Sequence, residues 1–378
     1  DLDPTDPDDR TALDAKVGAV MDLGISWIVL AFDDIEAGPD GGATQASVAN
    51  ELLAGMRGRD AAAELVVVPT EYVGSRPSPY LAALGDDLDP SIGLMWTGPT
   101  VCSPTISGAD AAIRAARVGG RAPLVWDNVL VNDGLMASSL HLGPYRGRDG
   151  ELATSVSGIL LNPMNQALCS RIAIATAAEY LASPTRYDAD AAWVRAIERV
   201  DGGRGWLAPI ARALADSPVN PPSSIPASAL LEAHDWDALR AEVRALRDAG
   251  RRVEAAATDD PLAAEIAPWC DAIARETDAA GAALRLIRRL DDGPVDAAGA
   301  MADAIGVAWA WSAAATRSDH AVLGPRAAVH PAVVQLPDGR PAFDVGLGLR
   351  FGPNVVDRLC RHALDAYEAW RTAQEVDA

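Results

Sequence analysis

The sequence predicts an α/β fold: a parallel sheet with outer helices, of the (β/α)8 TIM-barrel type, followed by an α-helical accessory domain. Two features of the first half of the chain predict the sheet: short apolar segments alternate with helical ones, and each apolar segment ends in polar or aromatic residues. Such alternation indicates parallel strands. Polar residues at several strand ends favour a barrel, in which those ends carry the chemistry. After about residue 187 the sequence becomes rich in Ala, Arg, Glu and Leu, which predicts the helical domain.

The first strand is the clearest, because an unbroken apolar run stops at the adjacent carboxylates Asp33 and Asp34. A run of this kind is typical of a strand buried on both faces. The other strands and the intervening helices follow in regular alternation. We expect strands at 26–32, 64–69, 92–96, 123–126 and 157–161, and helices at 9–23, 44–57, 79–85, 108–118 and 165–181.

A barrel of this type needs eight strands, so these five are interpreted as its C-terminal five, with three further strands expected before residue 1. The structural alternative is an open doubly wound sheet. Such a sheet would usually carry a Gly-rich phosphate turn, and neither GxGxxG nor GxxxxGK[ST] occurs in the chain.

Three domains are expected: 1–186 as the C-terminal part of a barrel, 187–322 as an α-helical accessory domain, and 323–378 as a tail. The tail combines a short β segment, with a turn at Pro337–Gly339, and a terminal helix at 354–373. Helices of the accessory domain are expected at 189–199, 227–249, 259–290 and 295–315. Its tryptophans recur at spacings that favour core packing: Trp193, Trp206, Trp236, Trp269, Trp309 and Trp311.

The composition excludes several classes of partner. A net charge of −21 and a pI near 4.5 argue against nucleic acid and anionic membrane surfaces, and disfavour a polyanionic substrate. The four cysteines are widely spaced, so neither a zinc site nor a disulfide framework is expected. No apolar run approaches the length of a membrane span. Because the chain opens without Met, its start does not decide between an exported and a retained protein, and the oligomeric state is also undetermined.

The residues at the strand ends are the candidate site. In order they read FDDI, PTEY, WTGP, WDN with ND three residues later, and LNPM. Taken singly, each has a commonplace structural explanation: Asp33 and Asp34 start a loop, Tyr72 and Trp126 are core aromatics, and Asn162 forms a turn with the following proline. Other polar residues nearby are weaker candidates for the site. Arg148 is expected to clasp a loop. His141 lacks the Ser or Cys partner of a hydrolase triad.

Taken together and in order, the five motifs resemble the β-N-acetylglucosaminidase domain of glycoside hydrolase family 84. That family includes the protein O-GlcNAcases and bacterial hyaluronidase-like hexosaminidases. The resemblance covers roughly residues 9–195, with weaker similarity at Glu265–Trp269. The chain departs from the family pattern in two places. Val129 and Leu130 replace a Tyr-Pro pair within WDNVLVND, and the family's EGFYG-type opening strand is not in the sequence.

The resemblance implies a retaining exo-β-N-acetylglucosaminidase that uses no metal or organic cofactor and acts on GlcNAc-bearing glycans or glycoproteins. In this family the substrate's own 2-acetamido oxygen attacks the anomeric carbon in place of an enzymic nucleophile. The attack forms an oxazoline intermediate. By the match, Asp33 would accept the acetamide N–H and Asp34 would be the general acid/base. The substrate would be bound by Tyr72, Thr97, Trp126, Asn128, Asp133 and Asn162.

Two other functions stay open at this point. The absent strands suggest a non-catalytic GlcNAc-binding protein or an inactive fragment of a barrel. Within the enzyme class, an endo-acting hyaluronidase is the alternative, and the charge of −21 disfavours it.

Overall fold

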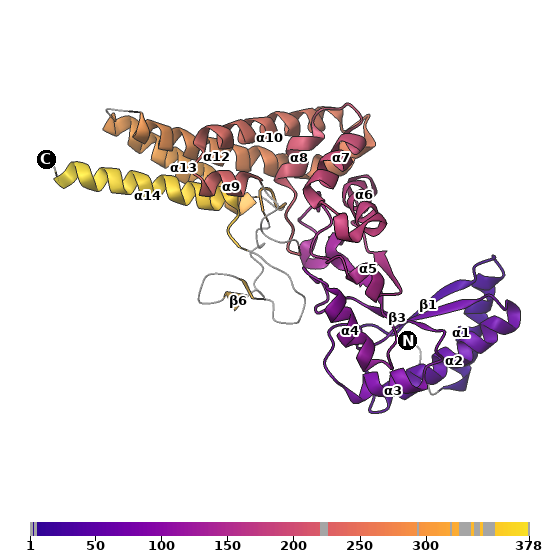
Figure 1. Cartoon of the computed structure of the whole chain (residues 1–378). Helices are drawn as coiled ribbons and strands as arrows, with labels where there is room; N and C mark the ends of the chain where they lie inside the picture. Colours follow the sequence, from indigo (N-terminus) through magenta and orange to yellow (C-terminus); the bar gives the residue numbers. More distant parts are fainter. Residues whose placement is uncertain are drawn as a thin grey trace.

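A computed structural model of the chain describes residues 3, 6–219, 226–292, 295–317, 320–324, 334–335, 341–342 and 352–376. Five strands form one sheet in the order β1-β2-β3-β4-β5, each parallel to the next (Figure 1). The predicted parallel α/β sheet is therefore confirmed. The strands are β1 (Trp27–Ala31), β2 (Glu64–Val68), β3 (Gly93–Trp96), β4 (Leu124–Asp127) and β5 (Gly158–Leu161).

Helices alternate with the strands, as the sequence predicts, and local signals set where several begin. The Ser78 hydroxyl caps one helix by accepting from the backbone N–H of Leu81. Ser107 caps the next in a reciprocal capping box with Asp110. The helices of this half are α1 (Pro7–Met21), α2 (Gly41–Arg59), α3 (Pro79–Asp87), α4 (Gly108–Arg117), α5 (Leu152–Ser155) and α6 (Ala167–Ala182). Short 3-10 turns follow β4 at η1 (Asn128–Leu130) and η2 (Gly134–Met136).

The two faces of the sheet have different surroundings. Successive side chains of a strand point to opposite faces, so in β2 Leu65 and Val67 join the core formed with α2 and α3. Val66 and Val68 lie on the other face, in a small cluster with Met95. The residues that pack against this second cluster include Tyr72 and Trp126.

The edge strands are less buried than the sequence predicts. In β1, Trp27 is 45% exposed and Val29 37%, although the unbroken apolar run indicated burial on both faces. Leu160 in β5 is 43% exposed. Among the described residues, only β2 pairs with β1 and only β4 pairs with β5. The apolar side chains of Trp27, Val29 and Leu160 have no strand opposite them in the described part of the chain. The prediction of two buried faces holds for β2 and β3, is only partly met in β4, and is wrong for the edge strands β1 and β5.

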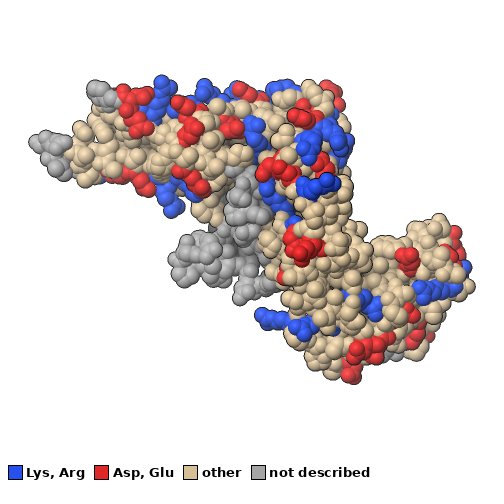
Figure 2. All heavy atoms as spheres, in the orientation of Figure 1, with Lys and Arg blue, Asp and Glu red and all other residues tan. Residues whose placement is uncertain are grey.

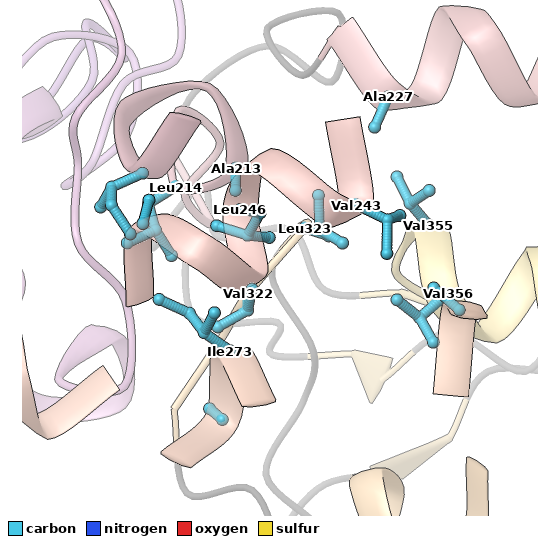
Figure 3. Close-up of a cluster of buried hydrophobic side chains, with 14 of the residues drawn as sticks. Ala213, Leu214, Ala227, Val243, Leu246, Ile273, Val322, Leu323, Val355 and Val356 are labelled. Carbon is cyan, nitrogen blue, oxygen red and sulfur yellow. The ribbon is translucent and has the colours of Figure 1, made fainter. Parts of the chain in front are cut away.

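The second half of the described chain is helical and has one extensive core. Figure 3 shows part of this core, in which labelled side chains such as Leu246, Ile273 and Val356 come from different helices. The core also includes Cys169 and Ile172 of α6. Ala173 and Ala177 of the same helix belong to a cluster that Ile159 and Leu161 of β5 pack against, so α6 contacts both the helical core and the sheet. The helices are α7 (Ala189–Asp201), α8 (Leu207–Ala213), α9 (Pro226–Glu232), α10 (Trp236–Ala256), α11 (Pro261–Ile266), α12 (Cys270–Asp291), α13 (Ala297–Arg317) and α14 (Val355–Val376).

Three expectations for this half need correction or fall outside the description. The helix predicted at 227–249 is two helices, because His234 adopts a left-handed conformation (φ 54°) and Asp235 caps α10. Trp309 is 75% exposed and not a core residue, whereas Trp269 is 2% exposed. In the tail, β6 (Val334–Gln335) pairs antiparallel with β7 (Pro341–Ala342), and the turn expected at 337–339 lies outside the described residues.

The surface carries both signs of charge, and Figure 2 shows acidic and basic side chains interspersed over the helices. Within the described ranges, no helix is both long and apolar enough to cross a membrane. The same residues contain no group of three His, Cys, Asp or Glu side chains that could hold a metal ion.

Candidate active site

The candidate site lies at the carboxyl edge of the sheet. Because the strands are parallel and in sequence order, the residues that follow them come together at one edge. The residues predicted from the sequence follow β1, β2, β3, β4 and β5 in turn. Four of the eight predicted residues form two side-chain hydrogen-bonded pairs, each of which joins neighbouring strand ends.

The first pair joins the ends of β1 and β2. Tyr72 Oη donates a hydrogen bond to Asp34 Oδ1 at 3.0 Å. Asp34 has a left-handed backbone (φ 55°), a conformation that Asp tolerates better than most residues. The turn takes Asp33 and Asp34 out of strand alternation, leaving Asp33 half-buried and Asp34 exposed. The two neighbouring carboxylates are thus presented differently to solvent, with a phenol beside them.

The pKa of Tyr72 is raised, and both carboxylates contribute to the shift. Burial is the largest cause that raises the pKa of Tyr72 to about 12, followed by the hydrogen bond and charge of Asp34 and then the charge of Asp33. Tyr72 is therefore a neutral hydrogen-bond donor at physiological pH.

The loop that carries Tyr72 is fixed from two sides. The backbone carbonyl of Tyr72 accepts a hydrogen bond from Thr97 N at 3.1 Å, which links the loop to the end of β3. Arg114 from α4 donates to the carbonyl oxygens of Glu71 (2.8 Å) and Gly74 (3.2 Å). The Arg114 side chain is buried, and burial lowers its pKa to about 10. A buried guanidinium that holds backbone carbonyls gives the loop a defined shape.

The second pair joins the ends of β4 and β5. Asn162 Nδ2 donates to Asn128 Oδ1 at 2.9 Å, and Asn128 Nδ2 donates to the carbonyl of Val101 at 2.8 Å. Asn128 is 8% exposed, so its amide is oriented by protein partners. Asn162 remains half-buried and keeps one amide oxygen for a further donor.

The other predicted residues are less directly connected. The Thr97 hydroxyl donates to the Thr100 carbonyl at 3.1 Å and is buried, so it is directed into its own loop. Trp126 packs beside Tyr72 on the sheet face around Val68. Asp133 is exposed at the start of η2.

The pKa of the buried Cys102 thiol, in the loop after β3, responds to the charge of Asp133. Burial raises the pKa of its thiol to about 12, with smaller contributions from the charges of Asp133 and Asp127. Cys102 also contributes to the pKa of Tyr72. The loop after β3 also contacts both pairs, because Thr97 N at its start donates to the Tyr72 carbonyl and its Val101 carbonyl accepts from Asn128 Nδ2.

Comparison with known proteins identifies the family. A family model described as beta-N-acetylglucosaminidase matches residues 1–215, more than half of the chain. The chain belongs to this beta-N-acetylglucosaminidase family. The protein O-GlcNAcases of Rattus norvegicus and Mus musculus are each 31% identical to it over 198 residues, which are 48% of this chain and 21% of theirs. The chain therefore spans about a fifth of the length of these relatives.

Solved structures show the same fold. A mutant O-GlcNAc hydrolase from Thermobaculum terrenum has a TM-score of 0.73 at 22% identity, covering 100% of this chain and 80% of that one. The structure of CpGH84B has a TM-score of 0.71 at 20% identity, covering 96% and 62%. All the candidate residues lie within the part that matches the family model.

The sequence analysis missed the structural role of Asp127, which lies between two candidate residues of this beta-N-acetylglucosaminidase-family chain. Asp127 is fully buried between Trp126 and Asn128 and accepts hydrogen bonds from Arg148 Nε (2.8 Å), Arg148 Nη2 (2.5 Å) and Tyr145 Oη (2.6 Å). Burial opposes ionisation of Arg148, but Asp127 and Tyr145 raise the pKa of the guanidinium overall. The loop clasp predicted for Arg148 is thereby confirmed. The sequence signal that could have pointed to Asp127 was its position next to the candidate Asn128.

Proposed function

We propose that the chain carries part of the active site of a retaining exo-β-N-acetylglucosaminidase that removes terminal β-linked GlcNAc from glycoproteins or glycans. The observation that carries the proposal is the cluster at the ends of β1 and β2. There, two sequence-adjacent carboxylates lie beside a tyrosine whose hydroxyl donates to Asp34 at 3.0 Å. The family membership supports the same reaction class.

In the proposed mechanism the substrate's acetamide oxygen attacks the anomeric carbon and forms an oxazoline. Asp33 accepts the acetamide N–H and so favours the positive charge that develops on that group. Asp34 gives a proton to the leaving oxygen and later takes one from the attacking water. Two displacements at one carbon leave the β-configuration unchanged. Tyr72 positions the acetamide from the neighbouring strand end.

We propose that the remaining strand ends bind the sugar. Asn128 and Asn162 hold each other through their amides, which leaves Asn162 able to accept from a sugar hydroxyl. Asp133, exposed at the start of η2, would accept from another hydroxyl. Trp126 would form the apolar wall for the acetamide methyl group, with Thr97 as a smaller lining residue.

The site would be completed by a closed (β/α)8 barrel. The unpaired edges of β1 and β5, and the exposed apolar side chains of Trp27, Val29 and Leu160, support the addition of three further strands. We retain the division into a barrel part at 1–186, a helical domain at 187–322 and a tail at 323–378 as a proposal.

The test is turnover of an aryl β-GlcNAc by the chain and by any longer natural polypeptide that contains it. Asp34→Asn should lower kcat/KM by at least about a hundredfold, the lower range of general acid–base contributions. The matched control Asp40→Asn, which alters an aspartate at the start of α2, should keep parental turnover. NMR at early times should show the β-anomer as the first product. Parental activity in Asp34→Asn, or a first product of α-configuration, would refute the assignment.

A second function depends on whether the exposed apolar face of β1 stays uncovered. If no further strands cover it, the chain would bind GlcNAc without hydrolysing it. Calorimetry with GlcNAc alongside the turnover assay separates the two functions, because binding without turnover supports the second alone.

A further inference from the structure

A hollow of about 220 Å³ lies between α10 and α12. Its floor is apolar and includes the buried side chains of Val243 and Leu284. Gly281 contributes no side chain to it, and a Cβ built there would meet only Arg285 Nη1, at 3.6 Å. The missing side chain at residue 281 therefore leaves part of this space open.

Four guanidinium groups surround this apolar floor. Arg240, Arg244 and Arg247 lie on one face of α10, because they are spaced four and three residues apart, and Arg285 comes from α12. No acidic side chain lines the hollow among the described residues. The chain as a whole has a net charge of −21, so a local gathering of positive charge runs against its composition.

Two of these arginines have carboxylate partners outside the hollow. Arg240 Nη1 pairs with Asp237 at 2.7 Å, and Arg247 pairs with Asp278, both with carboxylates that are more than half exposed. Arg244 donates only to the Arg240 carbonyl, at 3.3 Å, and neither it nor Arg285 has an ion pair within the described part of the chain. Arg244 and Arg285 are thus the two guanidiniums of the hollow that have no carboxylate within ion-pair distance among the described residues.

The dimensions and chemistry define the ligand. A dry cavity of about 150 Å³ suffices for benzene in a protein interior, so this hollow has room for an apolar body of that size. A phosphate monoester carries up to two negative charges and matches the planar fork of a guanidinium in a bidentate manner. We propose that the hollow between α10 and α12 binds a small organic phosphate monoester. Arg244 and Arg285 hold its phosphate, and the apolar floor contacts its body.

This site is separate from the strand ends, since α10 and α12 lie in the helical part of the molecule, away from β1 and β3 (Figure 1). It does not depend on the proposed glycosidase function. Occupancy at this position would be expected to leave turnover of an aryl glycoside unchanged.

The experiment is calorimetry of the full chain with phenyl phosphate. Inorganic phosphate and phenol supply the anion and the apolar body separately, and each should bind at least about tenfold more weakly. Raising the salt concentration should weaken binding of phenyl phosphate, because the attraction is electrostatic.

Two variants test the two halves of the site. Arg244→Ala with Arg285→Ala removes charge at the surface, and Gly281→Leu fills the hollow while all four guanidiniums remain. Each should weaken phenyl phosphate binding at least tenfold. Gly281→Leu also raises helix propensity, and thermal unfolding checks that its fold persists. The matched control is Arg251→Ala, an exposed arginine of α10 outside the hollow, which should bind as the parent does.

The proposal is overturned if phenyl phosphate fails to bind at millimolar concentration, or if the double arginine variant binds it as the parent does. Equal affinity for inorganic phosphate and phenyl phosphate, or unaltered binding by a folded Gly281→Leu, would overturn the role given to the apolar floor.

Discussion

Tyr72→Phe isolates the contribution of one hydrogen bond to the proposed reaction. The substitution removes the Tyr72 Oη donor to Asp34 Oδ1 and leaves the ring packed against the sheet. A hydrogen bond to a charged group contributes about 1.5–3 kcal/mol. Asp34 is exposed, so water replaces part of the interaction, and we expect the lower end of this range. Since 1.36 kcal/mol is tenfold in rate, kcat/KM should fall roughly tenfold.

The pKa of Tyr72 adds a pH dependence to this prediction. A pKa of about 12 keeps the hydroxyl protonated from about pH 5 to pH 9, so the parent-to-variant ratio of kcat/KM should be constant there. The folded-state value lies above the ordinary 10.0. The neutral tyrosine therefore contributes stability that is complete below about pH 10 and is lost as the pH rises toward 12.

The assay is the initial rate on an aryl β-GlcNAc, measured in whichever natural polypeptide containing these residues turns it over. Tyr367→Phe on α14 is the matched control, because it removes a phenol far along the chain from the strand ends. Unchanged kcat/KM in Tyr72→Phe would refute the positioning role. A loss of about ten-thousandfold would show instead that Tyr72 takes part in the chemical step.

Three further predictions concern stability. Asp127→Asn should lower the free energy of unfolding by about 3–5 kcal/mol in urea, because it leaves the buried Arg148 guanidinium without its counter-charge; a loss below about 1 kcal/mol would contradict the clasp. Trp269→Ala should cost about 3–5 kcal/mol and Trp309→Ala less than about 0.5 kcal/mol, since the first is buried and the second is 75% exposed; equal losses would contradict the packing. Burial lowers the pKa of His141 to about 4 from 6.5, so the parent should lose stability as the pH falls from about 6.5 toward 4, and His141→Gln should lack that portion of the loss.

The sequence predicts the sheet because an apolar run that stops at polar residues has few other structural solutions. The same logic places Asp34 and Tyr72 at neighbouring strand ends, and their hydrogen bond follows from strand order. The sequence cannot predict the exposure of Val29. An apolar run looks the same whether or not a strand lies opposite it, and only the exposure of Trp27 and Val29 shows that none covers them among the described residues.

The Asp127 clasp was missed for a different reason. Its partners Arg148 and Tyr145 lie 21 and 18 residues away, and no local periodicity relates them. In the helical half, a residue can interrupt a helical pattern without a proline, as His234 does with its left-handed backbone. The apolar stripe around Trp309 has the spacing of a core face, and only tertiary packing shows that this side of α13 meets no neighbour in the described structure.

The most direct test of substrate assistance varies the nucleophile itself. Successive fluorination of the N-acetyl group of an aryl β-GlcNAc withdraws electrons from the acetamide oxygen and leaves the leaving group unchanged. We predict that kcat/KM falls steadily from the N-acetyl to the N-trifluoroacetyl substrate. A rate independent of fluorination would contradict the account, because it would mean that the acetamide oxygen does not form the bond to the anomeric carbon.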